Sequence, residues 1–313
     1  MPASGADKLR RRTPKPQANL RRTSRNLEVS TGLLGSRLDC RAMRTVTPKA
    51  AALAADIIRC PVVDQCLAPG GEQLPCHRVV SWQGPHPDGA RYVPDPWSGH
   101  LERAAILFVS SNPGSDAKGA PISDASFTSA WSSDEIISCY DDAFEPWRKP
   151  GIADGVYLTD RSGSRGTKPI RYWVWARARA AELLERRPMP GVDYALTEVV
   201  HCGTQHEAGV AEAFTTCVDL YFERVLLASA ASLVICVGGW AHAAFKRAFN
   251  IDIEDHLWGP SEIAGRVRFV AAVPHPGAFG SPKGLEPYLG SENLDRLRAE
   301  LTALPSFPEH GEG

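Results

Sequence analysis

The sequence predicts an α/β protein, a three-layer αβα sandwich with a central four-stranded parallel sheet. Four short apolar runs have the length and composition of buried strands, and segments with helical periodicity separate them. Strands that alternate with helices favour a parallel sheet that is covered on both faces. Ligands bind beyond the carboxyl ends of such strands, so the residues at those ends are the first candidates for a site.

Each element is predicted from a local pattern. Helices are expected where apolar residues recur at helical spacing, and strands where an apolar run stops at a Pro or Gly turn. Segments rich in Pro, Gly, Ser or Cys are expected to be irregular, at 61–100 and 153–169. The predicted helices are 45–59, 132–144, 170–187, 208–228, 240–249 and 291–303, and the predicted strands are 105–110, 194–202, 232–237 and 267–275.

Charge divides the chain into two parts. Residues 1–42 carry 10 of the 35 Lys and Arg residues and 3 of the 36 Asp and Glu residues, which leaves 25 basic and 33 acidic residues, a net charge of −8, on the rest. The first part has no periodic apolar face, which predicts a disordered basic arm at 1–42 and one domain at 43–313. The arm is either a nucleic-acid contact or an upstream extension of a chain that starts at Met43. The acidic domain argues against a large duplex-binding surface.

Composition also limits location and cofactor. No apolar run approaches the length of a membrane span, and the N-terminus lacks the apolar core of a signal peptide. We therefore expect a soluble, cytoplasmic monomer with no membrane partner. The eight cysteines are too sparse for a secreted disulfide framework, which leaves metal binding or plain burial.

Two turns at predicted strand ends present polar side chains. In "ILFVSSNPGSD", Pro113 fixes the backbone and Gly114 permits a close approach, so Asn112 either holds a water through its carbonyl or forms an Asx turn. In "VPHPG", two prolines present His275, which suits a hydrogen-bond donor to a developing anion or is a solvated loop residue. Their expected convergence at one sheet edge favours a site.

Four segments resemble motifs of the uracil-DNA glycosylase superfamily. They are "ILFVSSNPGSD", "YALTEVVHC", "SLVICVGGWAHAAF" and "PHPGAFG", in the order and at about the spacing found there, and the resemblance covers residues 104–303. The Asn-Pro-Gly core is similar to the mismatch-specific and single-strand-selective branches. The cysteine-bearing strand is similar to the branches that carry an iron–sulfur cluster. The resemblance implies that fold, with DNA containing a damaged base, single- or double-stranded, as the partner.

The resemblance also implies residue roles. Asn112 would position the attacking water, and His275 would donate to O2 of the departing uracil anion, a contact that is strongest in the transition state. Ser111 and Gly114 would contact the base, which must leave the stack and enter the pocket. Phe127 would stack on it, although Ile122 stands where the family usually has phenylalanine.

The implied reaction is hydrolysis of the N-glycosidic bond, the first step of base excision repair. It would be monofunctional, because no lysine stands where an amine nucleophile is expected. His201 would lie near the base, and a histidine in this region would also be able to trap the sugar covalently.

Glu198 departs from the family pattern. The family commonly has asparagine there, which reads uracil with one donor and one acceptor. An ionised glutamate accepts from N3–H but offers nothing to O4, whereas a protonated one serves both atoms at the cost of a raised pKa. Glu198 therefore marks either a shifted base preference or a side chain that faces away from the pocket.

The cysteine spacing allows a 4Fe-4S cluster. Cys202 and Cys217 resemble the second ligand pair of the iron–sulfur branches, but the usual upstream Cys-x-x-Cys is absent. We expect Cys60 and Cys66 to complete the set, with Cys76 as a substitute. The alternatives are a zinc site or buried free thiols.

Two other functions compete with the glycosylase. One is a binding protein on the same fold that recognises or covalently captures damaged single-stranded DNA without turnover. The other is a metal- or thiol-dependent hydrolase of a small molecule, built on the cysteines and His275.

Overall fold

The structure, a computed structural model, describes most of the predicted domain. The described residues are 47–82, 93–114, 151–159, 164–278, 280 and 283–303. The basic arm at 1–42, the predicted helix at 132–144 and Phe127 lie outside these residues.

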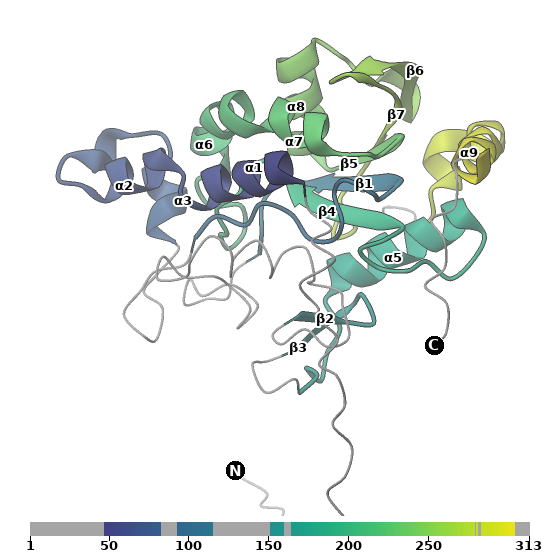
Figure 1. The fold of residues 1–313 in the computed structure, drawn as a ribbon, viewed down its shortest axis with the longest axis horizontal. Helices are drawn as coiled ribbons and strands as arrows, with labels where there is room; N and C mark the ends of the chain where they lie inside the picture. Colours follow the sequence, from purple (N-terminus) through teal and green to yellow (C-terminus); the bar gives the residue numbers. More distant parts are fainter. Residues whose placement is uncertain are drawn as a thin grey trace, which may run out of the picture. The chain divides into compact units, whose positions relative to one another are not determined.

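The centre of the domain is a five-stranded sheet with the order β4-β1-β5-β7-β6 (Figure 1). Four neighbouring strands are parallel, and β6 runs antiparallel to β7 at the edge. The four parallel strands confirm the predicted α/β class. The strand bounds are Ile106–Ser110 for β1, Tyr194–Glu198 for β4, Leu233–Val237 for β5, Leu257–Ile263 for β6 and Arg266–Val273 for β7.

The prediction of four strands was wrong because β6 was missed. This strand contains Gly259-Pro260, a pair that is typical of turns, and its register to β7 is irregular between Trp258 and Ser261. An edge strand tolerates such a proline because one side of it needs no ladder hydrogen bonds.

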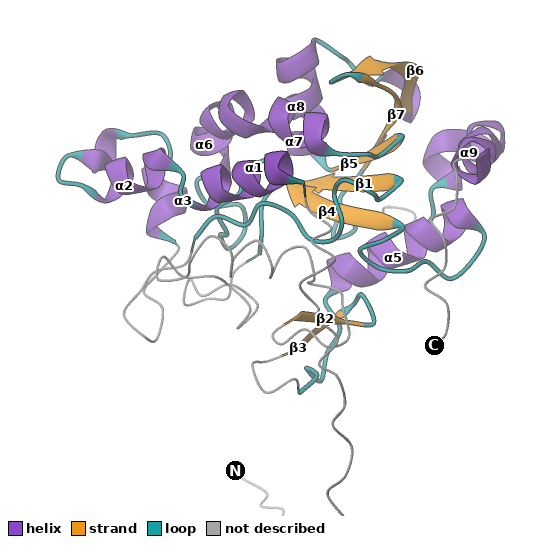
Figure 2. Cartoon of the chain, in the orientation of Figure 1, coloured by secondary structure: helices purple, strands orange, loops and turns teal. Residues whose placement is uncertain are grey.

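Helices cover both faces of the sheet (Figure 2). Alternate side chains of β1 point in opposite directions, so Leu107 and Val109 join one buried cluster while Ile106 and Phe108 join the other. The first cluster includes α1, α6, η3, α7 and α8, and the second includes α5 and α9. The bounds are Pro48–Ile58 for α1, Arg171–Leu184 for α5, Val210–Cys217 for α6, Val218–Phe222 for η3, Glu223–Ala228 for α7, Gly239–Phe249 for α8 and Glu286–Ala303 for α9.

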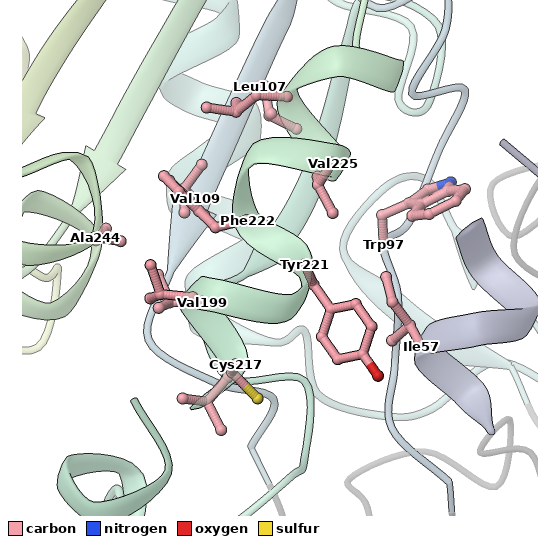
Figure 3. Close-up of a cluster of buried hydrophobic side chains, with 14 of the residues drawn as sticks. Ile57, Trp97, Leu107, Val109, Val199, Cys217, Tyr221, Phe222, Val225 and Ala244 are labelled. Carbon is pink, nitrogen blue, oxygen red and sulfur yellow. The ribbon is translucent and has the colours of Figure 1, made fainter. Parts of the chain in front are cut away.

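The predicted helix at 208–228 is one rod with a π-helical turn, η3, between α6 and α7. Its apolar face carries Tyr221, Phe222 and Val225, which lie in the first buried cluster with Val109 and Val199 (Figure 3). This packing holds the rod, and Cys217 within it, against the sheet.

Two segments that were predicted to be irregular contain short elements. The first holds α2, Pro61–Leu67, the 3₁₀ turn η2, Gly71–Gln73, and α3, His77–Ser81. The second holds the hairpin of β2, Gly151–Ala153, and β3, Tyr157–Thr159. A further 3₁₀ turn, η4, covers Glu254–His256. Helices of five to seven residues are too short to develop a helical period in the sequence. No helix in the described ranges has both the length and the apolar character needed to cross a membrane.

Candidate functional site

A cavity of about 340 Å³ opens at the carboxyl ends of β1 and β4. Ser110 and Glu198 are paired at the last position of these two strands, so the residues that follow meet at one edge of the sheet. We call this cavity the strand-end pocket. Five of the predicted site residues line it: Ser111, Asn112, Gly114, Glu198 and His275.

The turn that carries Asn112 is bound to the segment after β4. Beyond the strands, the Val199 and Val200 amides donate to the carbonyls of Ser110 and Ser111, each at 2.9 Å. The Thr204 amide donates to the Pro113 carbonyl at 3.0 Å. The segments that follow β1 and β4 therefore stay paired around the pocket, and these hydrogen bonds hold the turn at the edge of the sheet.

The amide group of Asn112 has one fixed orientation. Its Nδ2 donates to Thr204 Oγ1 at 2.9 Å, to the Pro113 carbonyl at 3.0 Å and to the Cys202 carbonyl at 3.4 Å. Its Oδ1 accepts from Ser111 Oγ at 3.3 Å. Because protein acceptors occupy the nitrogen, the atom that retains free capacity is Oδ1, which can accept a hydrogen bond from a water.

The ring of His275 is held by its own turn. The Gly277 amide donates to His275 Nδ1 at 3.1 Å, so Nδ1 is an acceptor. In the neutral tautomer the hydrogen is therefore on Nε2, which becomes a donor. The ring lies parallel to that of Tyr172, with 6.3 Å between centroids and 10° between planes. The arrangement suits donation to an anion in the pocket.

Glu198 lies in the pocket without a compensating cation. Burial, and then the nearby carboxyl of Asp95, raise its pKa to about 8. No lysine or arginine is present among the described residues that line the pocket. A raised pKa favours the neutral carboxyl, and Glu198 is one of the residues that line the pocket.

Sequence reasoning missed several pocket residues, among them Tyr172 and Thr204. The aromatic residues of α5 were interpreted as core packing, because they recur at helical spacing, yet Tyr172 and Trp173 line the pocket. The Tyr172 hydroxyl is buried and forms no hydrogen bond of acceptable geometry with the described residues, although Ser110 lies close enough to lower its pKa. Burial and Glu198 have the larger effect and raise the pKa of Tyr172. Thr204 had no sequence signal, since its contact with Asn112 spans 92 positions.

The structure does not bring His201 into the pocket. Its side chain is buried, Nδ1 bonds the Asp95 carbonyl at 2.8 Å, and the ring meets that of Tyr221 edge to face at 5.7 Å. Burial lowers its pKa to about 4, against a smaller opposing effect of the Asp95 hydrogen bond. His201 is thus a neutral core residue, whereas His206 and Glu207 line the pocket.

Five buried thiols lie on the other side of the same segment. Burial raises the pKa values of four of these thiols, and the negative charge of neighbouring thiolates raises them further. The resulting pKa is about 11 for Cys76 and about 12 for Cys217. The His201 amide donates to Cys217 and lowers its pKa in part. We call these residues the thiol cluster: Cys60, Cys66, Cys76, Cys202 and Cys217.

Within the thiol cluster, four of the five thiols all affect one another electrostatically. Every pair among Cys60, Cys76, Cys202 and Cys217 interacts, whereas Cys66 interacts with Cys60 and Cys76. Four thiols from separate elements are a donor set that suits iron–sulfur clusters and zinc. Among the described residues, however, no three His, Cys, Asp or Glu side chains are arranged so that they could hold a metal ion. The set therefore fits a cluster by the chemistry of its donors alone, and the electrostatic effects include Cys76 with Cys60, Cys202 and Cys217.

No family model matches this chain, and no curated protein compared with it matches either. The chemical capacity of the site therefore has to be argued from its geometry. The strand-end pocket combines a fixed carbonyl acceptor on Asn112, a donor on His275 and a neutral acid on Glu198, between apolar walls of Trp97 and Leu196.

Proposed function

We propose that this protein is a DNA glycosylase, with a uracil-DNA glycosylase-like fold, that hydrolyses the N-glycosidic bond of uracil or a related deaminated base. The observation that carries the proposal is the single pocket shared by Asn112, Glu198 and His275 at the carboxyl edge of the sheet. These three residues come from the ends of β1, β4 and β7, which are far apart in the sequence. Asn112 and His275 are also positions at which the sequence resembles that superfamily, whereas Glu198 departs from its pattern.

The proposed mechanism divides the charge of the transition state between two residues. Breaking the bond develops positive charge on the sugar and negative charge on the base. Asn112 Oδ1 orients a water toward the sugar carbon, and its dipole favours the positive side. His275 donates from Nε2 to the carbonyl oxygen of the departing base, where the contact strengthens as negative charge grows.

Aromatic side chains supply the rest of the base site. A base taken out of the stack needs a face to pack on, and Tyr172 and Trp173 both line the pocket. Tyr172 takes the role that the sequence assigned to Phe127. On the exposed loop before α5, Arg165 and Lys168 are candidates for phosphate contacts.

The test uses oligonucleotides that hold one uracil, single- or double-stranded, followed by alkali to cleave abasic sites. The wild-type protein is expected to give strand scission, and Asn112→Ala is expected to lower the single-turnover rate by about 10²–10⁴-fold. A denaturant-resistant protein–DNA band without turnover would favour the capturing protein, with His206 as the residue to substitute. Equal scission by wild-type and Asn112→Ala proteins would contradict the proposed mechanism.

The hydrolase built on the cysteines is disfavoured by thiol chemistry. The nucleophile in such enzymes is a thiolate, and burial raises the pKa of the thiols at Cys76, Cys202 and Cys217. These thiols are therefore protonated and inert unless a metal binds them.

We further propose that Cys60, Cys76, Cys202 and Cys217 hold a 4Fe-4S cluster with a structural role. Bound there, the group would crosslink the α1–α3 region to the end of β4 and to the α6 rod. Its charge would relieve the repulsion among the four thiolates. Cys202 also connects this set to the pocket, since its carbonyl accepts from Asn112.

Anaerobic purification tests this second proposal. The protein is expected to be brown and to contain iron and acid-labile sulfide, all of which Cys76→Ala loses. Cys66→Ala is the matched control and is expected to retain them, because Cys66 is not one of these four thiols. Retention in Cys76→Ala with loss in Cys66→Ala would restore the set expected from the sequence. Zinc in place of iron would overturn the cluster.

A further inference from the structure

On the premise of the glycosylase function above, we propose that Glu198 recognises the base as a neutral carboxylic acid, donating to a carbonyl oxygen of the base and accepting from the adjacent ring N–H. The pocket would then take bases whose edge pairs a carbonyl acceptor with an N–H donor, and would reject edges that present two donors.

The position of Glu198 is fixed by the sheet. It is the last residue of β4, in register with Ser110 of β1, and both residues line the strand-end pocket. The side chain therefore belongs to the same wall as Asn112, and a base between Asn112 and His275 presents its edge to it. The pocket lining also includes the apolar side chains of Trp97, Leu158, Ile170 and Leu196.

Burial and Asp95 are the two influences that favour the neutral form of Glu198. The titratable groups that line the pocket with it are Asp95, Tyr172, His206, Glu207 and His275. Asp95 is a carboxyl that raises the pKa of Glu198, and burial raises it further, to about 8. Glu207 is a second acid, and it accepts from Trp240 Nε1 at 3.2 Å. The neutral acid needs no partner cation, and the described lining of the pocket offers none.

The Tyr172 hydroxyl is a second polar group at the pocket. Its oxygen is buried, and Ser110 lies close enough to lower its pKa, in a contact that does not meet hydrogen-bond geometry. Because burial and Glu198 raise its pKa, it remains a neutral donor. A buried hydroxyl without a partner costs free energy, which a ligand with a carbonyl oxygen would recover.

The hydrogen-bonding capacities identify the base edge. A neutral carboxyl has one O–H donor and one carbonyl acceptor, which is the same pair that a carboxamide has. Uracil and hypoxanthine present a carbonyl beside a ring N–H and match this pair. Guanine presents the same pair at O6 and N1–H, and its amino group adds a second donor, so that only its N1–H and amino donors together match the ionised carboxylate. Recognition of a uracil edge should therefore be lost as Glu198 ionises.

Recognition of the base should weaken as the pH rises, because it depends on the carboxyl proton of Glu198. Below the pKa of about 8 the carboxyl keeps its proton, and both hydrogen bonds to a uracil edge form. Above it the donor is absent and two acceptors face the carbonyl, so binding should fall about tenfold for each pH unit. Glutamine cannot titrate, so Glu198→Gln should preserve recognition and remove the alkaline loss.

The experiment compares wild type, Glu198→Gln and Glu198→Leu on a single-stranded oligonucleotide with one uracil, by single-turnover excision across the neutral and alkaline range. We expect an alkaline loss in the wild type, none in Glu198→Gln, and loss at every pH in Glu198→Leu, with circular dichroism confirming the fold. An inactive but folded Glu198→Gln, or the same alkaline loss in both proteins, would overturn the proposal.

A second measurement separates this inference from the glycosylase function. Infrared difference spectroscopy of the free wild-type and Glu198→Gln proteins follows the protonated carboxyl stretch without DNA. A stretch that disappears near pH 8 supports the neutral acid even where no oligonucleotide is cleaved. A carboxyl that is already ionised at neutral pH overturns it, whatever the protein does to DNA.

Discussion

The strand-end pocket and the thiol cluster share one short segment, residues 198–204, and differ in how their polar atoms are satisfied. In the pocket, the Tyr172 hydroxyl has no acceptable hydrogen bond to the described residues, and Glu198 has no cation beside it. In the thiol cluster, the sulfurs are buried in the first core cluster among aliphatic and aromatic side chains.

This difference indicates what each region is built for. Unmet hydrogen-bonding capacity beside a cavity lowers stability and is recovered when a ligand binds, which supports the proposal that the pocket is a recognition site. Thiols packed into a core cost little by themselves, so their convergence has a structural meaning. The two regions touch at Asn112, whose nitrogen bonds both Thr204 and the Cys202 carbonyl.

After Asn112→Ala, the largest expected effect on the reaction is that of His275→Ala. It removes the donor to the departing base while leaving the core intact, because the side chain is exposed. We expect the single-turnover excision rate to fall by about 10²–10³-fold, with an unchanged thermal unfolding midpoint. Gly277→Ala is the graded control: a Cβ there would lie 3.1 Å from His275 Nδ1, so it should shift the ring and lower the rate by less. Full activity in His275→Ala would remove this residue from the mechanism.

Cys76→Ala should show the opposite pattern. We expect it to lower the free energy of unfolding by clearly more than the about 1 kcal/mol typical of a substitution, because it dismantles the crosslink of four elements. The single-turnover rate should change little, as measured on the fraction that remains folded. Cys236→Ala is the matched control, since Cys236 is equally buried in β5 but outside the thiol cluster. Equal destabilisation by both substitutions would reduce the thiol cluster to ordinary core packing.

Local patterns were sufficient for the parts of the fold with strong periodicity. The strands β1, β5 and β7 are apolar runs that end in Pro or Gly turns, and α1 and α8 carry clear apolar stripes. Those same strand ends led to Asn112 and His275. The strand β6 could not be predicted, because its Gly259-Pro260 pair is typical of a turn.

The details that depend on tertiary contacts were beyond the sequence. Tyr172 follows the same helical spacing as its core neighbours, so only packing reveals that it lines the pocket. Which upstream thiol besides Cys60 interacts with Cys202 and Cys217 depends on how α2, η2 and α3 fold. In the structure it is Cys76, rather than Cys66, that affects the pKa of both. The pKa of Glu198 is a property of the pocket around it, and the sequence offered only the two protonation states as alternatives.

Thr204→Val tests the connection between the two regions. Valine keeps the shape of the side chain but removes the hydroxyl that accepts from Asn112 Nδ2 at 2.9 Å. With that bond lost, the amide of Asn112 is less well oriented, and we expect the single-turnover rate to fall by about five- to tenfold with DNA affinity unchanged. Thr204→Ser restores the hydroxyl and should recover the rate. A loss that Thr204→Ser does not recover would assign the effect to packing.

A separate effect, on stability rather than on the reaction, is the pH dependence that Glu198 imposes. Its pKa is about 8 in the folded protein against an ordinary value of 4.5, so the folded chain holds a proton between these values that the unfolded chain has lost. Stability from this group is complete below pH 4.5 and is lost as the pH rises toward 8, with a slope of up to about 1.4 kcal/mol per pH unit. Glu198→Gln should flatten this part of the curve.

Urea unfolding of both proteins across that range measures the difference between the two curves. His201, whose pKa burial lowers to about 4, changes stability in the opposite sense at acidic pH, but it does so in both proteins and cancels in the difference. Parallel curves for wild type and Glu198→Gln would mean that the carboxyl is ionised in the folded protein. The proposed difference between a pocket with unmet polar groups and a satisfied core would then not hold at Glu198.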